Sequence, residues 1–570
     1  MPQPSAMTLE SRAIGPDPVV RRMFERLDLQ RLLETYVPGK SHGRRRDLSH
    51  GRALAVMVQN LVLSRAPLYR VAEWLKGRDP ALCGLADDAE AALLQDDRIA
   101  RALDALYAAE PASLMTAVVV RAVKEFGIDL SQLHNDSTTV TFSGAYAKQQ
   151  PADAADRPPL ITFGHNKDHR PDLKQLVYAL TISADGAVPV HYKTWDGNVT
   201  DDRTHQQTWD FVRSLAGRAD FVYVADSKLC TKENLQYLHA RGGRFVTVLP
   251  RSRKEDDEFR AHVRSHAVPW EEVLREPNPR GAELPPHVYR AYQPPERAHD
   301  GHRLVWFVSS EKAEHDQRRR ARRIERARRR LEELEARTGA HRFRSVAAAR
   351  EAVDKVLGEE GAARWLDVAV AEHTVAEHRQ VGAGRPGPHT RYRRTESAYV
   401  MLEIKDRAEA VLADAACDGL FAMVTNLDDA TPRAVLDLYK YQPFLEKRNE
   451  QLKSVLAVAP VFLKKPKRVA ALLFLYFLAV LVHALIEREV RRGMKKARRV
   501  SLPLYPEGRP AKSPTTALVL QALEPLRRHR LLDGDGNVVR VFYDALPETA
   551  LTVLRLLRVD LRHYGADVTS

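Results

Sequence analysis

The stretch L-S-Q-L-H-N-D-S-T-T-V-T-F, residues 130–142, decides how the chain can fold. Polar and apolar residues alternate along it, which is typical of a β-strand, and Asp136 lies near its centre. The preceding residues, 1–125, instead place apolar side chains at helical spacing. The change of period near residue 128 therefore predicts an α/β domain that follows a helical region.

Later segments predict the rest of an α/β core. Four more strands are expected, at 175–182, 188–194, 221–225 and 245–249. A turn at Asp185-Gly186 joins the first two, and one helix is expected over about 202–215. Thr231 can cap a second helix before the last strand. Three strands, helix, strand, helix and strand is the order of a ribonuclease H-like core.

We therefore expect an α/β fold, with a ribonuclease H-like catalytic core that is interrupted by an insertion domain. The expected regions are a helical, DNA-binding N-terminal region (1–125), the first part of the core (126–250), the insertion domain (251–412), the second part of the core (413–500) and a C-terminal helical extension (501–570). A chain of 570 residues is long enough for this division.

The charge balance favours a polyanionic partner. Lys and Arg number 89 against 75 Asp and Glu, which gives a formal charge of +14 and an isoelectric point near 9.5. Nucleic acid is the first candidate, and a basic protein without such a partner is the alternative. Three widely spaced cysteines form no zinc pattern or disulfide framework, and the N-terminus has no signal segment, so we expect a cytoplasmic protein.

One apolar run, Val469 to Ile486, reaches the length of a membrane span with 18 residues. Only Tyr476 and His483 interrupt it, and the basic Lys464 to Arg468 precedes it. A membrane-associated protein is one interpretation. We favour a helix that is buried in a large core, with no membrane partner, because no second run of this kind occurs.

The N-terminal region contains a candidate DNA-binding module. Ser49 can cap a helix that ends near Arg65, and Pro67 starts a second helix with two aromatic residues. The cluster Arg44-Arg45-Arg46 stands just ahead. Two short helices around a turn resemble DNA-binding helical modules, and a plain packing domain is the alternative.

The insertion domain contains a long charged helix, Lys312 to Arg337, with apolar residues at heptad-like spacing. Its arginines could follow a DNA backbone, and a solvated helical arm is the alternative. Short strands are expected at 288–292, 304–309 and 399–404, with a loop over Gly382 to Pro388. Trp306 is expected in the core rather than against an unpaired base.

Acidic residues in two strands suggest metal-dependent chemistry. Asp136 lies within its strand, and Asp226 directly follows the strand 221–225, where its side chain can face the crevice in which α/β sheets bind ligands. Carboxylates bind hard ions such as Mg²⁺, and two such ions can catalyse phosphoryl transfer. Taken singly, a strand-end aspartate is more often a turn or cap residue.

A third acidic residue, Glu446, stands in Y-K-Y-Q-P-F-L-E-K-R-N-E-Q-L-K, residues 439–453. Pro443 predicts a break between two helices, the second running to about residue 456. Glu446 and Lys453 are seven residues apart and would share a face of that second helix, although an ordinary surface pair has the same spacing. The residues expected in the first helix are Tyr439 and Gln442.

These segments resemble the bacterial DDE transposases of the insertion-sequence 4 superfamily, in its 1634-type branch. That branch has the signature Y-x2-R-x3-E-x6-K. Tyr439, Glu446 and Lys453 match the signature, and Gln442 stands where it has Arg. Other segments that resemble the branch are H-N-D-S-T-T-V (134–140), D-H-R-P-D-L-K-Q (168–175), D-G-N-V-T-D (196–201), A-D-S-K-L (225–229) and Y-P-E-G-R-P (505–510).

The resemblance implies that Asp136, Asp226 and Glu446 form the catalytic triad and hold two Mg²⁺ or Mn²⁺ ions. It also implies that Tyr439 and Lys453 contact the transposon end. The expected partner is double-stranded DNA, which would be cleaved at terminal inverted repeats and joined to target DNA by a 3′-hydroxyl. A homodimer assembled on DNA, at the nucleoid in the cytoplasm, is expected to do this.

Further polar residues are candidates for DNA contact. They are His165, Lys167, Arg170 and Lys174 before the second strand, Lys228 after Asp226, and Gln442. A structural, hydrogen-bonded corner is the alternative for the first four. The alternative to an active enzyme is a catalytically inactive, element-derived DNA-binding protein. The presence of all three carboxylates favours activity.

Overall fold

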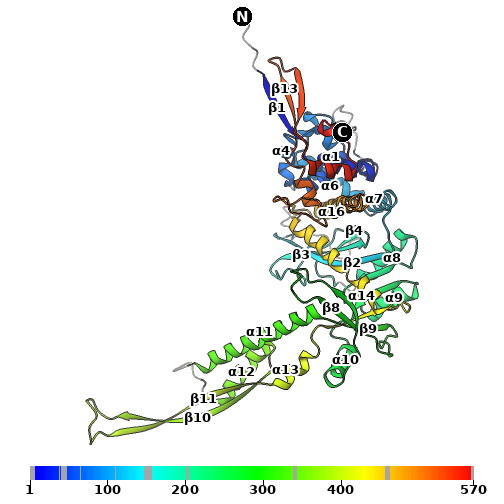
Figure 1. The fold of residues 1–570 in the computed structure, drawn as a ribbon. Coiled ribbons are helices and arrows are strands. Elements are labelled where there is room, and N and C mark those ends of the chain that lie inside the picture. Colours follow the sequence, from blue (N-terminus) through cyan, green and yellow to red (C-terminus); the bar gives the residue numbers. More distant parts are fainter. Residues whose placement is uncertain are drawn as a thin grey trace. The chain divides into compact units, whose positions relative to one another are not determined.

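The structure, a computed structural model, describes residues 7–37, 39, 48–64, 66–109, 111–144, 146, 157–200, 204–337, 343, 345–455 and 463–566. The chain forms two compact units (Figure 1). Unit 1 consists of Met1–Thr247 and Asp437–Ser570, and unit 2 of Val248–Leu436. Unit 1 is therefore discontinuous in the sequence, and it contains all three predicted catalytic carboxylates.

A mixed β-sheet lies at the centre of unit 1. Its strands are β2 (Gln132–Phe142), β3 (Lys174–Ser183), β4 (Val188–Asp196), β5 (Val222–Ala225) and β6 (Arg244–Val248), in the order β4-β3-β2-β5-β6. The pairs β2–β3 and β3–β4 are antiparallel, whereas β2–β5 and β5–β6 are parallel. The α/β class and the predicted strands are confirmed, and the ribonuclease H-like core stays a prediction.

Two helices connect the parallel strands. They are α8 (His205–Ala216) and α9 (Lys232–Ala240). Thr231 caps α9 as predicted, since its side chain accepts a hydrogen bond from the backbone N–H of Asn234. The helix expected from residue 202 begins at His205, and residues 201–203 lie outside the described part of the chain.

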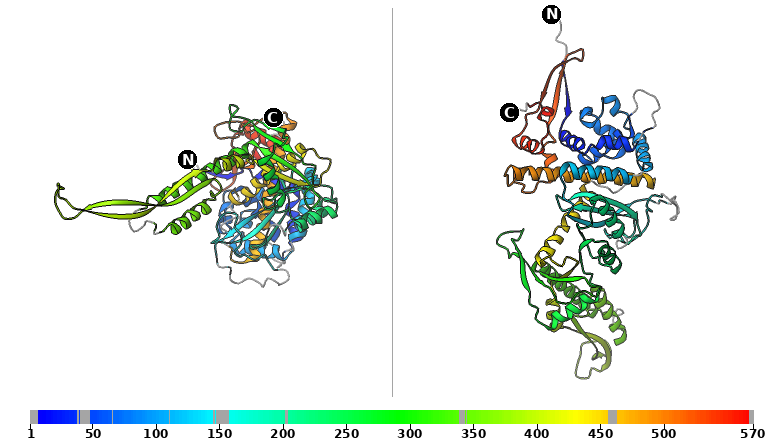
Figure 2. Two further views of the ribbon diagram at one scale, coloured as in Figure 1. Left: turned by 90° about the horizontal axis from the view of Figure 1, so that it is seen from below. Right: turned by 90° about the vertical axis from the view of Figure 1, so that its right-hand side faces the viewer.

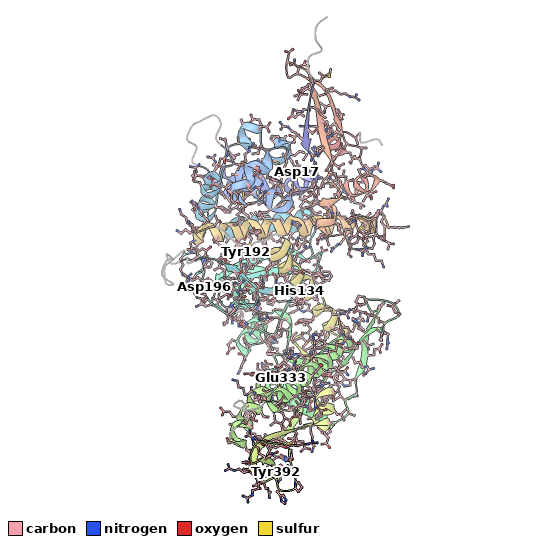
Figure 3. All side chains as sticks on the ribbon, turned by 90° about the vertical axis from the view of Figure 1, so that its left-hand side faces the viewer. Asp17, His134, Tyr192, Asp196, Glu333 and Tyr392 are labelled. Carbon is pink, nitrogen blue, oxygen red and sulfur yellow. The ribbon has the colours of Figure 1, made fainter. Side chains whose placement is uncertain are left out.

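A long apolar helix, α16 (Pro466–Lys496), packs against the sheet and the N-terminal helices of unit 1 (Figure 2). On the sheet side, Tyr192 of β4 stacks on Phe477 of α16 at 4.9 Å between ring centroids (Figure 3). The most apolar 18-residue window of this helix is 94% buried, so α16 is a core helix, as expected. The bent pair α6 and α7 would also be long and apolar enough if it were counted as one span.

The N-terminal helices form a packed layer. They are α1 (Asp17–Leu27), α2 (Leu29–Tyr36), α3 (His50–Leu63), α4 (Val71–Leu75), α5 (Asp88–Ala91), α6 (Asp96–Ala108) and α7 (Pro111–Phe126). Ser49 caps α3 as predicted, but 11 of the 14 residues in α3 are buried. Because α3 packs against α2, α6 and α16, and α4 has only five residues, this pair does not form an exposed recognition module. Arg44-Arg45-Arg46 lies outside the described residues.

The N-terminal region is helical as predicted apart from one short strand, whereas the predicted helical C-terminal extension is wrong in part. Beside α17 (Thr516–Gln521) and α18 (Glu548–Leu557), the C-terminal region contains a hairpin of β13 (Arg527–Leu532) and β14 (Val538–Tyr543). The N-terminal β1 (Thr8–Ala13) pairs with β13 and completes a three-stranded sheet. Gly536, with a φ of 83°, allows the turn, and the β-branched and aromatic residues of V-V-R-V-F-Y favour the strand.

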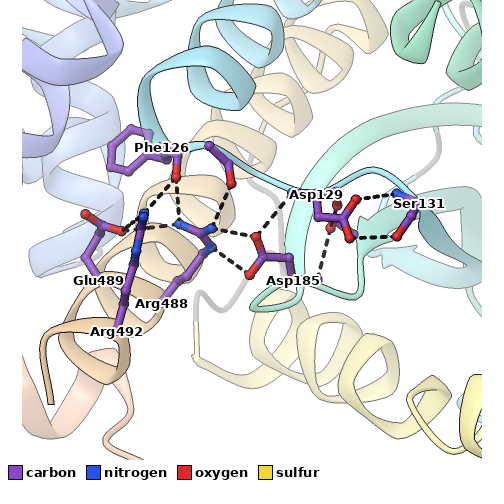
Figure 4. Close-up of polar contacts among 9 residues, drawn as sticks. Phe126, Asp129, Ser131, Asp185, Arg488, Glu489 and Arg492 are labelled. Carbon is purple, nitrogen blue, oxygen red and sulfur yellow. Dashed lines mark hydrogen bonds and ion pairs between the residues drawn. The ribbon is translucent and has the colours of Figure 1, made fainter. Parts of the chain in front are cut away.

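A polar network fixes the start of β2 against α16 (Figure 4). Arg488 of α16 forms an ion pair with Asp185 in the β3–β4 turn and donates to the backbone carbonyl of Phe126 at 3.0 Å. Asp185 accepts from the backbone N–H of Asp129, and Asp129 accepts from that of Ser131 at 2.8 Å. The strand that carries Asp136 is therefore anchored at its first residues.

Unit 2 contains an antiparallel sheet in the order β12-β9-β8-β7. Its strands are β7 (Glu271–Glu276), β8 (His287–Tyr292), β9 (Arg303–Ser309) and β12 (Leu420–Thr425), and its helices are α10 (Lys254–Ser265), α11 (Ser310–Glu335), α12 (Val346–Glu360) and α13 (Ala408–Ala415). Two 15-residue strands, β10 (Leu366–Gln380) and β11 (Tyr392–Asp406), form a separate hairpin. Trp306 is 1% exposed and stacks on Phe259, so it is a core residue as expected.

The charged helix α11 has a partner within unit 2. Ala327, Leu331 and Leu334, from the predicted apolar stripe, form a buried cluster with residues of α12. Several of its arginines form internal ion pairs, such as Arg320 with Asp418. The others are Arg318 with Glu314, Arg328 with Asp406, Arg329 with Glu333 and Arg330 with Glu359 and Glu360. The helix is therefore not a free, solvated arm.

Candidate active site

Asp136 of β2 and Asp226, which directly follows the parallel neighbour β5, stand at the same level of the sheet. The ladder between β2 and β5 pairs residues whose numbers differ by 90, and its last pair is Asn135 with Ala225. Asp136 is the next residue of β2, and Asp226 is the residue that directly follows the end of β5. Side chains at equivalent positions of adjacent strands point to the same face, and the strands are about 4.8 Å apart. The sheet therefore brings the two predicted carboxylates together.

The helix that carries Glu446 differs from the prediction at both of its ends. Helix α14 (Pro432–Tyr439) ends before the break, and α15 (Gln442–Glu450) begins at Gln442 rather than Pro443. Pro443 stands in the first turn of α15, where its missing N–H costs no hydrogen bond. A π-helical segment, η5 (Gln451–Val455), follows and contains Lys453. Its wider turn means that the α-helical spacing of Glu446 and Lys453 does not hold.

Asn449 connects α15 to the first aspartate, and sequence reasoning missed it. Its side-chain amide donates to Asp136 Oδ2 at 3.2 Å. Glu446 precedes Asn449 by three residues and thus lies one turn away on the same face of α15. Glu446 is exposed, whereas Asn449 is 6% exposed. The sequence did contain a signal for this role of Asn449, because Asn449 follows Glu446 by three residues, which is one turn of a helix.

The phenol of Tyr439 is influenced by all three carboxylates. Burial raises the pKa of Tyr439, and the negative charges of Asp226, Glu446 and Asp136 raise it further. All three carboxylates are therefore within electrostatic reach of one phenol. The hydroxyl stays protonated at neutral pH and remains a hydrogen-bond donor.

Gln442 is not placed to contact DNA. It is 4% exposed, and its Oε1 accepts a hydrogen bond from Nδ1 of His134 at 2.8 Å (His134 is marked in Figure 3). On the other side of the ring, Gln132 Nε2 donates to His134 Nε2 at 2.7 Å. Burial lowers the pKa of His134 to about 4, although the Gln442 bond acts in the opposite direction. Gln442 is thus a buried link between α15 and β2.

Arg448 anchors the other side of α15. Its side chain is 6% exposed and forms an ion pair with Glu487 of α16 at 2.8 Å. Its Nε donates to the carbonyl of Ala187 at 3.1 Å, and Nη2 donates to that of Gly186 at 3.3 Å. The helix that carries Glu446 is therefore attached to the β3–β4 turn and to α16.

Two predicted DNA contacts lie beside the aspartates. Lys167 Nζ is 3.7 Å from Asp136 Oδ1 and donates to the backbone carbonyl of Ser137 at 2.7 Å. Lys453 Nζ forms an ion pair with Asp168 at 2.7 Å. Both ammonium groups are accessible to solvent, and Lys167 lowers the negative potential at Asp136.

The remaining predicted contacts are more distant or more loosely placed. Lys228 is exposed, and its backbone N–H donates to Asp226 Oδ1 at 3.0 Å, so the side chain starts next to the site. Arg170 forms a two-pronged bond with Asp172. His165 is exposed, and Lys174 Nζ lies 5.8 Å from the centre of the Phe163 ring.

The side chains around Asp136 suit a hard divalent ion chemically. Three carboxylates offer oxygen ligands, and Asn449 Oδ1 is a buried acceptor for which the described residues supply no donor. Across those residues, no three His, Cys, Asp or Glu side chains are close enough together to hold a metal. The oxygen donors are of the chemical kind that Mg²⁺ takes, but in this structure the three carboxylates are not gathered around a common point.

A known family matches the N-terminal part of the chain. Residues 9–120 match a family described as a domain of unknown function, DUF4277. This match covers β1 and the N-terminal helices and includes none of the three carboxylates. No curated protein matches the chain.

Proposed function

We propose that this protein is a DNA transposase with a ribonuclease H-like core. It would cleave the ends of an insertion sequence at terminal inverted repeats and join them to target DNA. The observation that carries the proposal is the register of β2 and β5, which sets Asp136 level with Asp226 just past the end of β5, with Glu446 one helical turn from the Asn449 that donates to Asp136.

Asp136, Asp226 and Glu446 would hold two Mg²⁺ or Mn²⁺ ions, which when bound activate the attacking oxygen and stabilise the leaving oxygen. Asn449 orients Asp136 through its amide. The protonated Tyr439 would donate a hydrogen bond to a phosphate oxygen of the DNA end.

Lys167 and Lys453 would exchange their carboxylate partners for DNA phosphates. Both lysines already point to carboxylates at or near the site, at 3.7 and 2.7 Å. Joining two ends to a target requires two sites, so the active form would be a homodimer on double-stranded DNA. Its place would be the nucleoid in the cytoplasm.

The test mixes purified protein with a labelled transposon end in Mg²⁺ and follows release of a 3′-hydroxyl. Asp136→Ala, Asp226→Ala and Glu446→Ala should each abolish release. Asp220→Ala is the matched control, because Asp220 is an exposed carboxylate that precedes β5, at the end opposite Asp226. Cleavage that survives Glu446→Ala would remove that residue from the proposed triad.

Removal of the metal ions should distinguish cleavage of DNA from binding of DNA. With EDTA, cleavage should stop while the protein still retards the same DNA in a gel, because the basic side chains need no metal. Added Mn²⁺ should restore cleavage. Cleavage that persists in EDTA would contradict a metal-dependent mechanism.

A second candidate function is a DNA-binding protein derived from such an element and without activity. Two observations favour it: the carboxylates are not gathered at ligand distance among the described residues, and Lys167 occupies one side of Asp136. In the same assay this candidate predicts DNA binding without cleavage in either Mg²⁺ or Mn²⁺.

A further inference from the structure

A cavity of about 530 Å³ lies within unit 2, apart from the three carboxylates of unit 1. It is bordered by α10, by one face of α11, by the end of α13 and by the residues just before β10. Lys312, Asp316, Arg319 and Arg323 recur along α11 at intervals of three or four and therefore share the face toward the cavity. The volume is in the range of small-ligand sites.

The lining carries a large excess of positive charge. Eight of the lining side chains are Arg or Lys and three are Asp. Arg260 also forms a buried ion pair with Asp256 at 2.6 Å, so four positive charges remain uncompensated. The three carboxylates are already engaged. Asp418 pairs with Arg320 at 2.7 Å, Asp316 with Lys312 at 2.6 Å, and Asp414 with Arg264 at 3.1 Å.

The carboxylates hold the cavity in shape. Besides Arg264, Asp414 also pairs with Arg364 at 3.2 Å and accepts from the indole N–H of Trp365 at 2.8 Å. Arg323 lies over the Trp365 ring, 5.7 Å from its centre, and donates to the carbonyl of Glu360. These guanidinium groups are thus fixed in position before any ligand arrives.

Two arginines of the cavity have charge or hydrogen-bond donors that the described residues do not satisfy. Arg319 is exposed and makes no ion pair with any residue in the described parts of the chain. Arg264 Nε is buried and finds no hydrogen-bond acceptor within those parts. A buried N–H without an acceptor is costly, and an anionic oxygen in the cavity would satisfy it. Arg251, at the rim, reaches a carboxylate only at 3.5 Å.

We propose that this cavity binds a ligand with linked phosphate groups. Guanidinium forks match phosphate oxygens in pairs, and four surplus charges suit two or more phosphates rather than one. The phosphates could belong to a free ligand, such as a nucleoside triphosphate or inorganic tripolyphosphate, or to a DNA strand that enters the cavity. The site is independent of the proposed transposase chemistry, since no lining residue belongs to unit 1.

The test uses the full-length protein in EDTA at low salt, with tripolyphosphate followed by calorimetry and a short labelled single-stranded oligonucleotide followed by fluorescence anisotropy. Arg319→Ala and Arg251→Ala should each weaken binding of the true ligand about tenfold, as expected for a lost charge-assisted bond. Both side chains are exposed and carry little of the fold. The matched control is Arg329→Ala, also on α11, whose only ion pair among the described residues is with Glu333 at 3.9 Å.

The outcomes separate the two sources. Tight tripolyphosphate binding that both variants weaken, with DNA binding unchanged, identifies a free ligand. Weakened DNA binding with competition by tripolyphosphate identifies a strand in the cavity. Binding of both probes that is unaffected by Arg319→Ala and Arg251→Ala, or equally weakened by Arg329→Ala, would overturn the proposal. A wild-type protein that fails to cleave DNA in Mg²⁺ would refute only the transposase chemistry.

Discussion

Protonation of His134 should loosen the sheet that carries Asp136. The ring is fully buried, accepts from Gln132 through Nε2 and donates to Gln442 through Nδ1. Its pKa is lowered by burial from 6.5 to about 4. Between pH 6.5 and pH 4, His134 is therefore protonated in the unfolded chain but not in the folded protein. The contribution of His134 to the free energy of unfolding is fully present above pH 6.5 and is lost as the pH decreases toward 4.

The expected size follows from the pKa difference. A shift from 6.5 to about 4 corresponds to about 3 kcal/mol when titration is complete. Between pH 7.5 and pH 5.0, the part that His134 contributes is about 2 kcal/mol. His134→Gln removes the titration and keeps one donor and one acceptor, so this variant should lose about 2 kcal/mol less than the wild type over the same interval.

The assay must report on unit 1 alone, because a chain with two units need not unfold in one step. We would apply pulses of hydrogen exchange at each step of a urea titration and follow peptides from 132–142 and 442–450. Their exchange gives the free energy of unfolding of unit 1. His191, whose pKa is lowered by burial to about 3, is present in both proteins and cancels in the comparison. Equal acid sensitivity of wild type and His134→Gln would refute the reasoning.

Three further predictions concern α15 and its neighbours. Arg448→Met removes the partner of the buried carboxylate Glu487 and should lower the free energy of unfolding in urea by about 3–5 kcal/mol. The second change Glu487→Gln should restore part of this loss, and a double variant as unstable as Arg448→Met would contradict the importance of the ion pair. Asn449→Ala should slow cleavage by releasing Asp136, with little change in melting temperature, and unchanged cleavage would count against its orienting role. Lys453→Ala breaks an exposed ion pair, so the free energy of unfolding should change by less than about 1 kcal/mol. The slope of log affinity for DNA against log salt concentration should decrease by about one phosphate contact, and an unchanged slope would exclude that contact.

The sheet of unit 1 was predictable because its signals are local. The alternation around Asp136, the short apolar strand before Asp226 and the Thr231 cap each depend on neighbouring residues. Pro443 likewise predicted the break before α15. Local patterns of this kind determine which residues form an element, even though they do not say what the element contacts.

What could not be predicted depends on contacts between distant residues. Gln442 looks like a surface position in the sequence, yet its partner His134 lies 308 residues away. The strand β1 exists because β13 pairs with it over a separation of more than 500 residues. The π-helical turn that contains Lys453 likewise has no local sequence signal, and it ends the α-helical spacing that joined Lys453 to Glu446.

The division of unit 1 has a consequence for synthesis of the protein. Glu446 follows Asp226 by 220 positions, and all of unit 2 is made between them. At roughly 5–20 residues per second, the ribosome needs about 10–45 s to pass from one to the other. During that time the nascent chain exposes the sheet without α15 and without α16, whose apolar residues pack against it in the finished protein. This interval is the period in which a chaperone would be most useful, and in which truncated chains would have two aspartates but no third carboxylate.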